Sequence, residues 1–131
     1  RIDLYPLVIS IIDYLTEKGY SLALVTGSPK IAVEHILPSE LIKKFKVIIS
    51  ADDVNFGKPS PEPYEKALRN LNLKTEEAFV IENAPMGILS AKNAGLTCFA
   101  IETTLSKEYL HQADVIVKNH DDLFSLLKNN Y

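Results

Sequence analysis

Three groups of polar residues have side chains suited to binding a phosphoryl group and a divalent cation. Thr26-Gly27-Ser28 and Glu82-Asn83 each follow a short apolar run, and Lys58 lies in a proline-rich loop between them. Hydroxyls and backbone N–H groups at the start of a helix bind anions, because the helix dipole places positive charge there. A carboxylate and an amide supply the hard oxygen ligands that Mg²⁺ requires. These residue types indicate a site for a phosphorylated ligand and a metal ion.

Each of these residues also has a structural explanation. Ser28 fits the N-cap of a helix whose first residue is Pro29, and we favour that role over a catalytic one. Lys58 fits a solvated loop lysine, and Glu82 fits a carboxylate that stabilises the start of the next helix. Asn83 fits the N-cap region of the same helix. The functional explanation is favoured for Lys58 and Glu82, and only slightly for Asn83.

The elements that must position these residues alternate between short apolar strands and helical segments. Strands are predicted at 22–25, 47–50, 78–81, 97–101 and 114–117. Helices are predicted at 5–18, 29–36, 39–45, 61–71, 85–94 and 121–129, with a further short one that ends near 112. Strands that alternate with helices form right-handed crossovers in a parallel sheet. The predicted fold class is α/β with a doubly wound parallel sheet, whose ligands bind at the carboxyl ends of the strands.

The composition is that of one globular domain, residues 1–131, with 47% hydrophobic and 24% charged residues. A net charge of −3 gives no electrostatic case for nucleic acid or an anionic membrane, and no apolar run reaches membrane-spanning length. The single cysteine, Cys98, lies in an apolar run and is expected in the core, as is Met86. One cysteine agrees with a reducing compartment, and we expect a cytoplasmic protein.

Three segments resemble motifs of a known family. The sequences LVTGS (24–28), GKPSPEPY (57–64) and VIENAPMGI (80–88) resemble motifs II, III and IV of the haloacid dehalogenase-like superfamily, in the branch of β-phosphoglucomutases and phosphatases. The three occur in the family's order, and the likeness extends over nearly the whole chain. It implies a Rossmann-like core domain and phosphoryl transfer through an aspartyl-phosphate with Mg²⁺ as cofactor.

The resemblance also implies a role for each matching residue. Thr26 would donate its hydroxyl and its backbone N–H to the phosphoryl oxygens, with Gly27 and Ser28 in the same substrate-binding turn. Lys58 would neutralise charge on the phosphoryl group and on the nucleophilic carboxylate. Glu82 and Asn83 would hold the Mg²⁺. The second position of motif IV is more usually Asp in the family, so Asn83 removes one negative charge from the metal site.

The family's motif I, an apolar strand followed by Asp-x-Asp, has no match in these residues. Asp52 and Asp53 follow a strand, but at the approach to motif III, so neither is assigned as the nucleophile. In the family, motif I and a helical cap that selects the substrate precede the first residue of this chain. We therefore interpret residues 1–131 as the carboxyl-terminal part of a core domain. We expect a gap in the sheet between the first strand and the Glu82 strand, and a chain that is poorly stable alone or completed by other polypeptide.

Two other function classes remain open at this point. A pseudoenzyme or binding module would keep the fold without motif I, and an Asp-x-Asp strand encoded upstream of Arg1 would discriminate against it. A receiver-like signalling domain also places acids, a hydroxyl and a lysine at strand ends. Thr26 precedes every candidate Asp at a strand end, which disfavours that class. The expected partners are a phosphorylated small molecule and the missing N-terminal segment, with no nucleic acid and no membrane.

Overall fold

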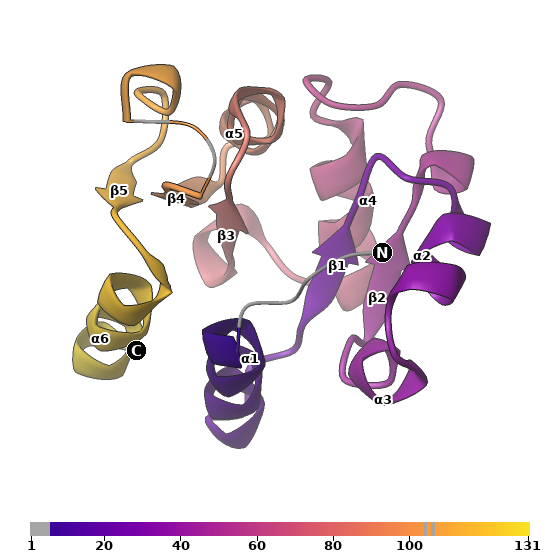
Figure 1. The fold of residues 1–131 in the computed structure, drawn as a ribbon. Coiled ribbons are helices and arrows are strands. Elements are labelled where there is room, and N and C mark those ends of the chain that lie inside the picture. The colour runs from indigo at the N-terminus through magenta and orange to yellow at the C-terminus, as the bar shows by residue number, and fades with distance from the viewer. Residues whose placement is uncertain (1–5, 104, 106) are drawn as a thin grey trace.

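The structure, a computed structural model, describes residues 6–103, 105 and 107–131 and confirms the predicted α/β class (Figure 1). The helices are α1 (Pro6–Glu17), α2 (Lys30–Ile36), α3 (Ser39–Ile42), α4 (Glu62–Leu71), α5 (Pro85–Asn93) and α6 (His120–Asn130). The strands are β1 (Ala23–Val25), β2 (Val47–Ile49), β3 (Phe79–Glu82), β4 (Thr97–Ile101) and β5 (Val115–Val117). Three single 3₁₀ turns add η1 (Ala51–Asp53), η2 (Thr75–Glu77) and η3 (Lys107–Tyr109). The helix predicted to end near 112 is therefore only the turn η3, and the predicted first helical residue, Tyr5, lies outside the described residues.

The strands form two parallel sheets, and the break between them falls where the family resemblance predicts a gap. One sheet pairs β1 with β2, with Leu24 opposite Ile48. The other has the order β3-β4-β5, with Val80 opposite Cys98. Figure 1 shows β3 and β1 as the neighbouring edges of the two sheets.

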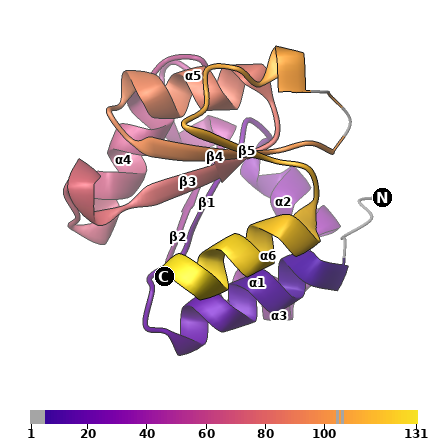
Figure 2. The same cartoon turned by 90° about the vertical axis from the view of Figure 1, so that its left-hand side faces the viewer.

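Helices cover both faces of the three-stranded sheet. In Figure 2, α5 lies on one face, and α1 and α6 lie side by side on the other. Successive residues of β4 point to opposite faces, so Cys98 and Ala100 pack with α5, whereas Phe99 and Ile101 pack with α1 and α6. Both clusters are apolar and buried, which explains why β4 is hydrophobic along almost its whole length. Cys98 is buried as predicted, and that burial raises the pKa of its thiol to about 12.

Helix α4 joins the two sheets on one face, because it packs against β1, β2 and α5. The sequence suggests Ser60 as its N-cap, but Pro61 occupies that position, and the Ser60 hydroxyl accepts a hydrogen bond from the Glu62 N–H at 3.2 Å. Gly19, with φ +90°, follows the C-terminus of α1, where a left-handed residue ends a helix. No helix among the described residues is both long enough and apolar enough to cross a membrane.

Two sequence-based expectations about local structure are wrong. Met86 is 55% exposed, because it lies on the outer face of the first turn of α5, so it is not a core residue. Ser28 does not cap α2: Pro29 occupies the N-cap position, and the Lys30 N–H donates instead to Oδ2 of Asp52 at 2.9 Å. Proline has no side-chain acceptor, so the negative charge at this helix start comes from η1.

Candidate active site

Lys58 connects the carboxyl ends of β1 and β3 across the break between the sheets. Its Nζ donates to the Val25 carbonyl at 3.1 Å and to Oε2 of Glu82 at 2.5 Å. The pair is largely shielded from solvent, with side-chain exposures of 19% for Lys58 and 8% for Glu82. The structure thus brings together two of the predicted site residues, which lie 24 positions apart in the sequence. A pair this shielded interacts more strongly than a surface ion pair does.

Tyr64 completes this cluster, although the sequence analysis gave it no functional role. Its hydroxyl donates to the same Glu82 oxygen, Oε2, at 2.6 Å, and its ring lies 5.5 Å from the Lys58 ammonium. Burial, followed by the negative charge of Glu82, raises the pKa of Tyr64, which keeps the hydroxyl protonated as a donor. The sequence signals were its place at the end of the segment GKPSPEPY (57–64) and on the apolar face of a helix, where a buried hydroxyl needs a partner.

The second oxygen of Glu82 has weaker protein contacts. Oε1 accepts only the Asn83 N–H, at 3.2 Å, among the hydrogen bonds of the described residues. Gly87, in the first turn of α5, lies against this carboxylate so closely that a Cβ at that position would overlap it. The Glu82 carboxylate is therefore fixed between Lys58 and Tyr64 on one side and the backbone of α5 on the other.

Asn83 is exposed beside Glu82 at the end of β3. Its Nδ2 donates to Oγ1 of Thr103 at 3.2 Å, which leaves the amide oxygen Oδ1 for another ligand. Oε1 of Glu82 and Oδ1 of Asn83 are both hard oxygen donors, so the chemistry of this pair fits Mg²⁺. Within the part of the chain that the structure describes, no group of three His, Cys, Asp or Glu residues is arranged to hold a metal ion.

The turn after β1 supplies the Thr26 hydroxyl and a backbone N–H that is free in the described part of the chain. That N–H belongs to Gly27, whereas we expected the N–H of Thr26. The Thr26 N–H donates to the Ile49 carbonyl at 2.9 Å and so continues the β1–β2 ladder. Oγ1 of Thr26 accepts the Ser28 N–H at 3.1 Å, which leaves its own hydrogen available for donation. The Gly27 N–H has no hydrogen-bond acceptor within the described residues. The backbone donor at this strand end is therefore that of Gly27.

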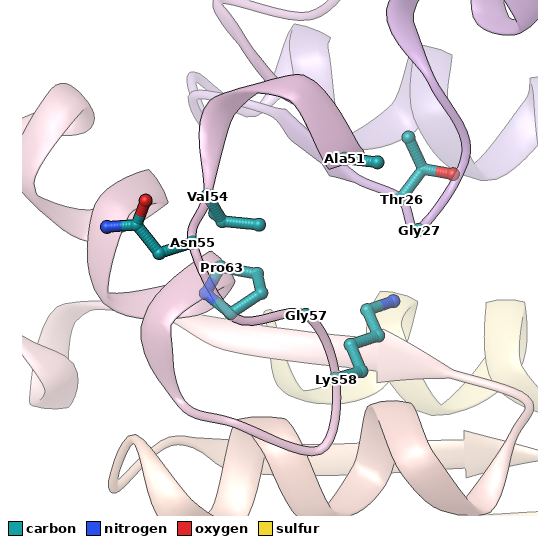
Figure 3. A pocket seen from close by; sticks show the side chains of 8 residues that line it. All are labelled: Thr26, Gly27, Ala51, Val54, Asn55, Gly57, Lys58 and Pro63. Carbon is teal, nitrogen blue, oxygen red and sulfur yellow. The ribbon is translucent and has the colours of Figure 1, made fainter.

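A small pocket lies between this turn and the loop that follows β2. Figure 3 shows Thr26 and Gly27 on one side, Val54 and Pro63 on the other, and the Lys58 side chain extending between them. The lining consists of Thr26, Gly27, Ala51, Val54, Asn55, Gly57, Lys58 and Pro63. Its volume of about 130 Å³ is smaller than the roughly 300–1,000 Å³ of sites for drug-sized ligands, so it suits a small group. Ser28, Glu82 and Asn83 are not part of this lining.

The loop that presents Lys58 is fixed by carboxylates at its two ends. Glu62 accepts the N–H groups of Asn55 and Phe56 at 2.8 and 2.9 Å, and these two bonds lower the pKa of Glu62. Asp53 accepts the Ser50 N–H at 2.8 Å and its hydroxyl at 2.9 Å, which lowers the pKa of Asp53. Glu62 and Asp53 therefore hold the backbone on either side of the pocket.

Comparison with known proteins shows the family to which this chain belongs. The family model of the haloacid dehalogenase-like hydrolases matches residues 1–101. The chain is 39% identical over 110 residues to validoxylamine A 7′-phosphate phosphatase of Streptomyces hygroscopicus subsp. limoneus, which covers 83% of this chain and 52% of that protein. It is 33% identical over 132 aligned residues to the pyrophosphatase PpaX of Bacillus cereus, covering 98% of this chain and 61% of the relative.

Among solved structures, a candidate β-phosphoglucomutase from Thermotoga maritima superposes with a TM-score of 0.87 at 30% identity. The superposition covers 97% of this chain and 61% of that one. The superposition and the family match agree on the α/β fold of this family. The chain belongs to the haloacid dehalogenase-like hydrolase family, in its β-phosphoglucomutase-like branch. It spans between about half and two thirds of the length of the relatives that it matches.

Proposed function

We propose that these residues form the phosphate- and metal-binding part of a Mg²⁺-dependent phosphohydrolase or phosphomutase. The observation that supports this most strongly is the contact of Lys58 with Glu82 at the carboxyl ends of two separate sheets, beside the Thr26–Gly27 turn. Ligands bind at this edge of doubly wound sheets. The relatives named above include a phosphatase, a pyrophosphatase and a candidate phosphomutase, which supports a phosphorylated small molecule as the substrate.

Three donors of this chain would bind the phosphoryl group. The Thr26 hydroxyl and the Gly27 N–H come from the turn after β1, and the Lys58 ammonium comes from the loop after β2. Phosphoryl transfer spreads negative charge over the oxygens that do not leave, so fixed donors and a cation stabilise the transition state more than the ground state. Lys58 is shielded from water, which strengthens this electrostatic effect.

Glu82 and Asn83 would hold the Mg²⁺ through Oε1 and Oδ1. When bound, the ion would neutralise charge on the phosphoryl oxygens and on the nucleophile. Thr103 would orient the Asn83 amide so that its oxygen, and not its nitrogen, faces the ion. Asn83 contributes no charge, so Glu82 would supply the only negative charge that this chain gives to the ion.

The nucleophilic aspartate would come from polypeptide outside these 131 residues. The break between β1 and β3 leaves room in the hydrogen-bonding pattern for one strand whose carboxyl end would lie beside Lys58 and Glu82. The chain also spans only 52–61% of the relatives that it matches. A strand that ends in Asp-x-Asp at this position would complete both the sheet and the site.

The test is hydrolysis of p-nitrophenyl phosphate and of pyrophosphate by the complete protein, with and without Mg²⁺. We expect Mg²⁺-dependent hydrolysis of at least one of them, and we expect Lys58→Ala to lower kcat/KM by on the order of 10²- to 10³-fold. Lys92→Ala is the matched control, because Lys92 pairs with Asp114 far from the site. A complete protein that hydrolyses neither compound, and whose ligand binding is unchanged by Lys58→Ala, would instead support a binding module.

A further inference from the structure

We propose that Tyr64 and Gly87 are positioning residues for the Glu82 carboxylate: Tyr64 fixes Oε2, and Gly87 leaves the space that the carboxylate occupies. Neither residue is a candidate ligand for the phosphoryl group or for the metal ion. Their proposed effect on metal binding rests on the function proposed above, whereas their effect on the position of Glu82 does not.

The Tyr64 hydroxyl meets the geometry for a strong hydrogen bond to a charged acceptor. It lies 2.6 Å from Oε2 of Glu82, and both side chains are buried, at 6% and 8% exposure. Hydrogen bonds to an ionised acceptor are shorter and stronger than neutral ones. The same oxygen receives Lys58, so Tyr64 and Lys58 together saturate Oε2 and leave Oε1 as the oxygen that faces a ligand.

Tyr64 comes from α4, which packs against β1, β2 and α5, so its hydroxyl connects Glu82 of β3 to a separate element. The rest of the tyrosine ring packs in the buried cluster with Val80 and Ile88. Replacement by phenylalanine would therefore keep the packing and remove only the hydrogen bond. Tyr64→Phe therefore tests the hydrogen bond to Glu82 separately from the packing of the ring.

Gly87 acts by leaving room for the Glu82 carboxylate, not by forming a bond to it. It is fully within α5, where glycine is unfavourable compared with alanine, and it is buried. A Cβ at this position would overlap the Glu82 carboxyl carbon and both of its oxygens. The side chain of Glu82 can lie against α5 only because residue 87 has none.

The decisive measurement is the melting temperature of the complete protein in two double-mutant cycles. We expect Gly87→Ala to lower the melting temperature in the wild-type background, because the carboxylate must leave its position. In the Glu82→Ala background the same change should raise it, because alanine favours the helix and no longer meets a carboxylate. Likewise, Tyr64→Phe should lower the melting temperature by several degrees in the wild-type background and have little effect when Glu82 is alanine.

A second measurement is the Mg²⁺ dissociation constant, obtained by calorimetry without substrate. We expect Tyr64→Phe to weaken Mg²⁺ binding roughly ten-fold, as loss of a group that orients a metal ligand does. Tyr14→Phe, which removes a hydroxyl bond to the Tyr131 carbonyl far from the site, should leave it unchanged. Wild-type affinity in Tyr64→Phe would overturn the metal-positioning role.

The two measurements separate this inference from the proposed function. If the wild-type protein binds no Mg²⁺ but both cycles show coupling, the metal function is wrong and the positioning of Glu82 stands. If the effects of Gly87→Ala and Tyr64→Phe are the same in the wild-type and the Glu82→Ala backgrounds, the positioning proposal is overturned. If Glu82→Ala does not fold, Tyr64→Phe and the Mg²⁺ titration decide the proposal.

Discussion

The two sheets of this chain are built from similar apolar strands but reach different degrees of burial. The central strand of the larger sheet, β4, is paired on both edges, and its last four residues are all buried. All three residues of β1 are only half-buried, although its sequence is equally apolar. The difference comes from pairing, because within the described part of the chain β1 has a hydrogen-bonded neighbour only on the β2 side. An apolar strand is buried when both of its edges and both of its faces are covered.

The candidate site lies where the two sheets meet, at the carboxyl ends of β1 and β3. Helix α4 on one face and Lys58 at the carboxyl edge connect the smaller sheet to the larger one. The residues that would bind phosphate come from the smaller sheet, and those that would bind metal come from the larger one. The geometry of the site therefore depends on how firmly the two halves are held together.

The largest expected effect is on the 131-residue chain studied by itself. The unpaired edges of β1 and β3 leave backbone groups without partners in a sheet, which is costly. We expect the monomeric chain to show no cooperative thermal transition well above room temperature, and the complete protein to show one. Calorimetry and size-exclusion chromatography of both would measure this. A monomeric chain with a sharp transition at high temperature would show that the smaller sheet needs no additional strand.

The next effect concerns the ion pair between the halves. We expect Lys58→Met in the complete protein to lower the free energy of unfolding by about 3 kcal/mol, because it leaves a buried carboxylate without its cation. Lys92→Met is the matched control, since Lys92 and Asp114 are 33% and 39% exposed and such pairs contribute about 1 kcal/mol or less. Denaturant unfolding would measure both. Equal losses would mean that Lys58 does not hold the halves together.

The sequence was sufficient to predict the fold and the strand ends, because these follow from local patterns. Apolar runs of four or five residues, bounded by turns and separated by helical segments, predict the strands to within one residue or so. The position of Glu82 at the end of its strand, and that of Lys58 in the loop after the second strand, follow from the same pattern. The gap between the sheets was predicted from the family's strand order, not from any property of the residues themselves.

The hydrogen-bond partners could not be predicted, because they depend on contacts between distant segments. The use of the Thr26 N–H by Ile49 depends on the register of β1 against β2. The capping of α2 by Asp52 requires η1 to lie against a helix 22 residues earlier in the sequence. Tyr64 lies in α4, 18 residues before Glu82 in β3, so their contact depends on how the two elements pack. Such contacts are fixed by packing, which a single sequence does not display.

The next smaller expected effect is the loss of stability when one leucine in each half is replaced by alanine. Leu127 is fully buried between α6 and the larger sheet, so Leu127→Ala should cost about 3 kcal/mol. Leu24 in β1 is half-buried, which corresponds to about 1 kcal/mol for the same change. If a further strand joins the sheets in the complete protein, Leu24 becomes buried and its cost should rise by about 1–2 kcal/mol toward that of Leu127. Denaturant unfolding of both variants in the complete protein would measure this, and a Leu24→Ala cost that stays near 1 kcal/mol would contradict the joined sheet.

The smallest expected effect is the pH-dependent contribution that one carboxylate in each half makes to the free energy of unfolding. The Lys92 ammonium, followed by the Cys98 N–H, lowers the pKa of Asp114, and the Ser50 N–H and hydroxyl lower the pKa of Asp53. A folded-state pKa below the unfolded one gives a stabilisation that is complete above about pH 4 and is lost as the pH falls through the folded pKa. We therefore expect Asp114→Asn and Asp53→Asn each to lower stability at pH 7 by less than about 1 kcal/mol, because both carboxylates are partly exposed.

The same two carboxylates test whether the halves unfold together in acid. The wild-type carboxylates become protonated as the pH falls through their lowered folded-state pKa values, so each Asn variant should approach the wild-type stability over that fall. If the complete protein unfolds as one unit, both variants shift a single acid transition by similar amounts. If the halves separate first, Asp53→Asn should shift an early transition at β2, whereas Asp114→Asn should shift a later one at β4. Circular dichroism and tyrosine fluorescence across pH 2–7 would distinguish these cases. A deficit in either variant that grows toward low pH would contradict the stated direction of the pKa shift.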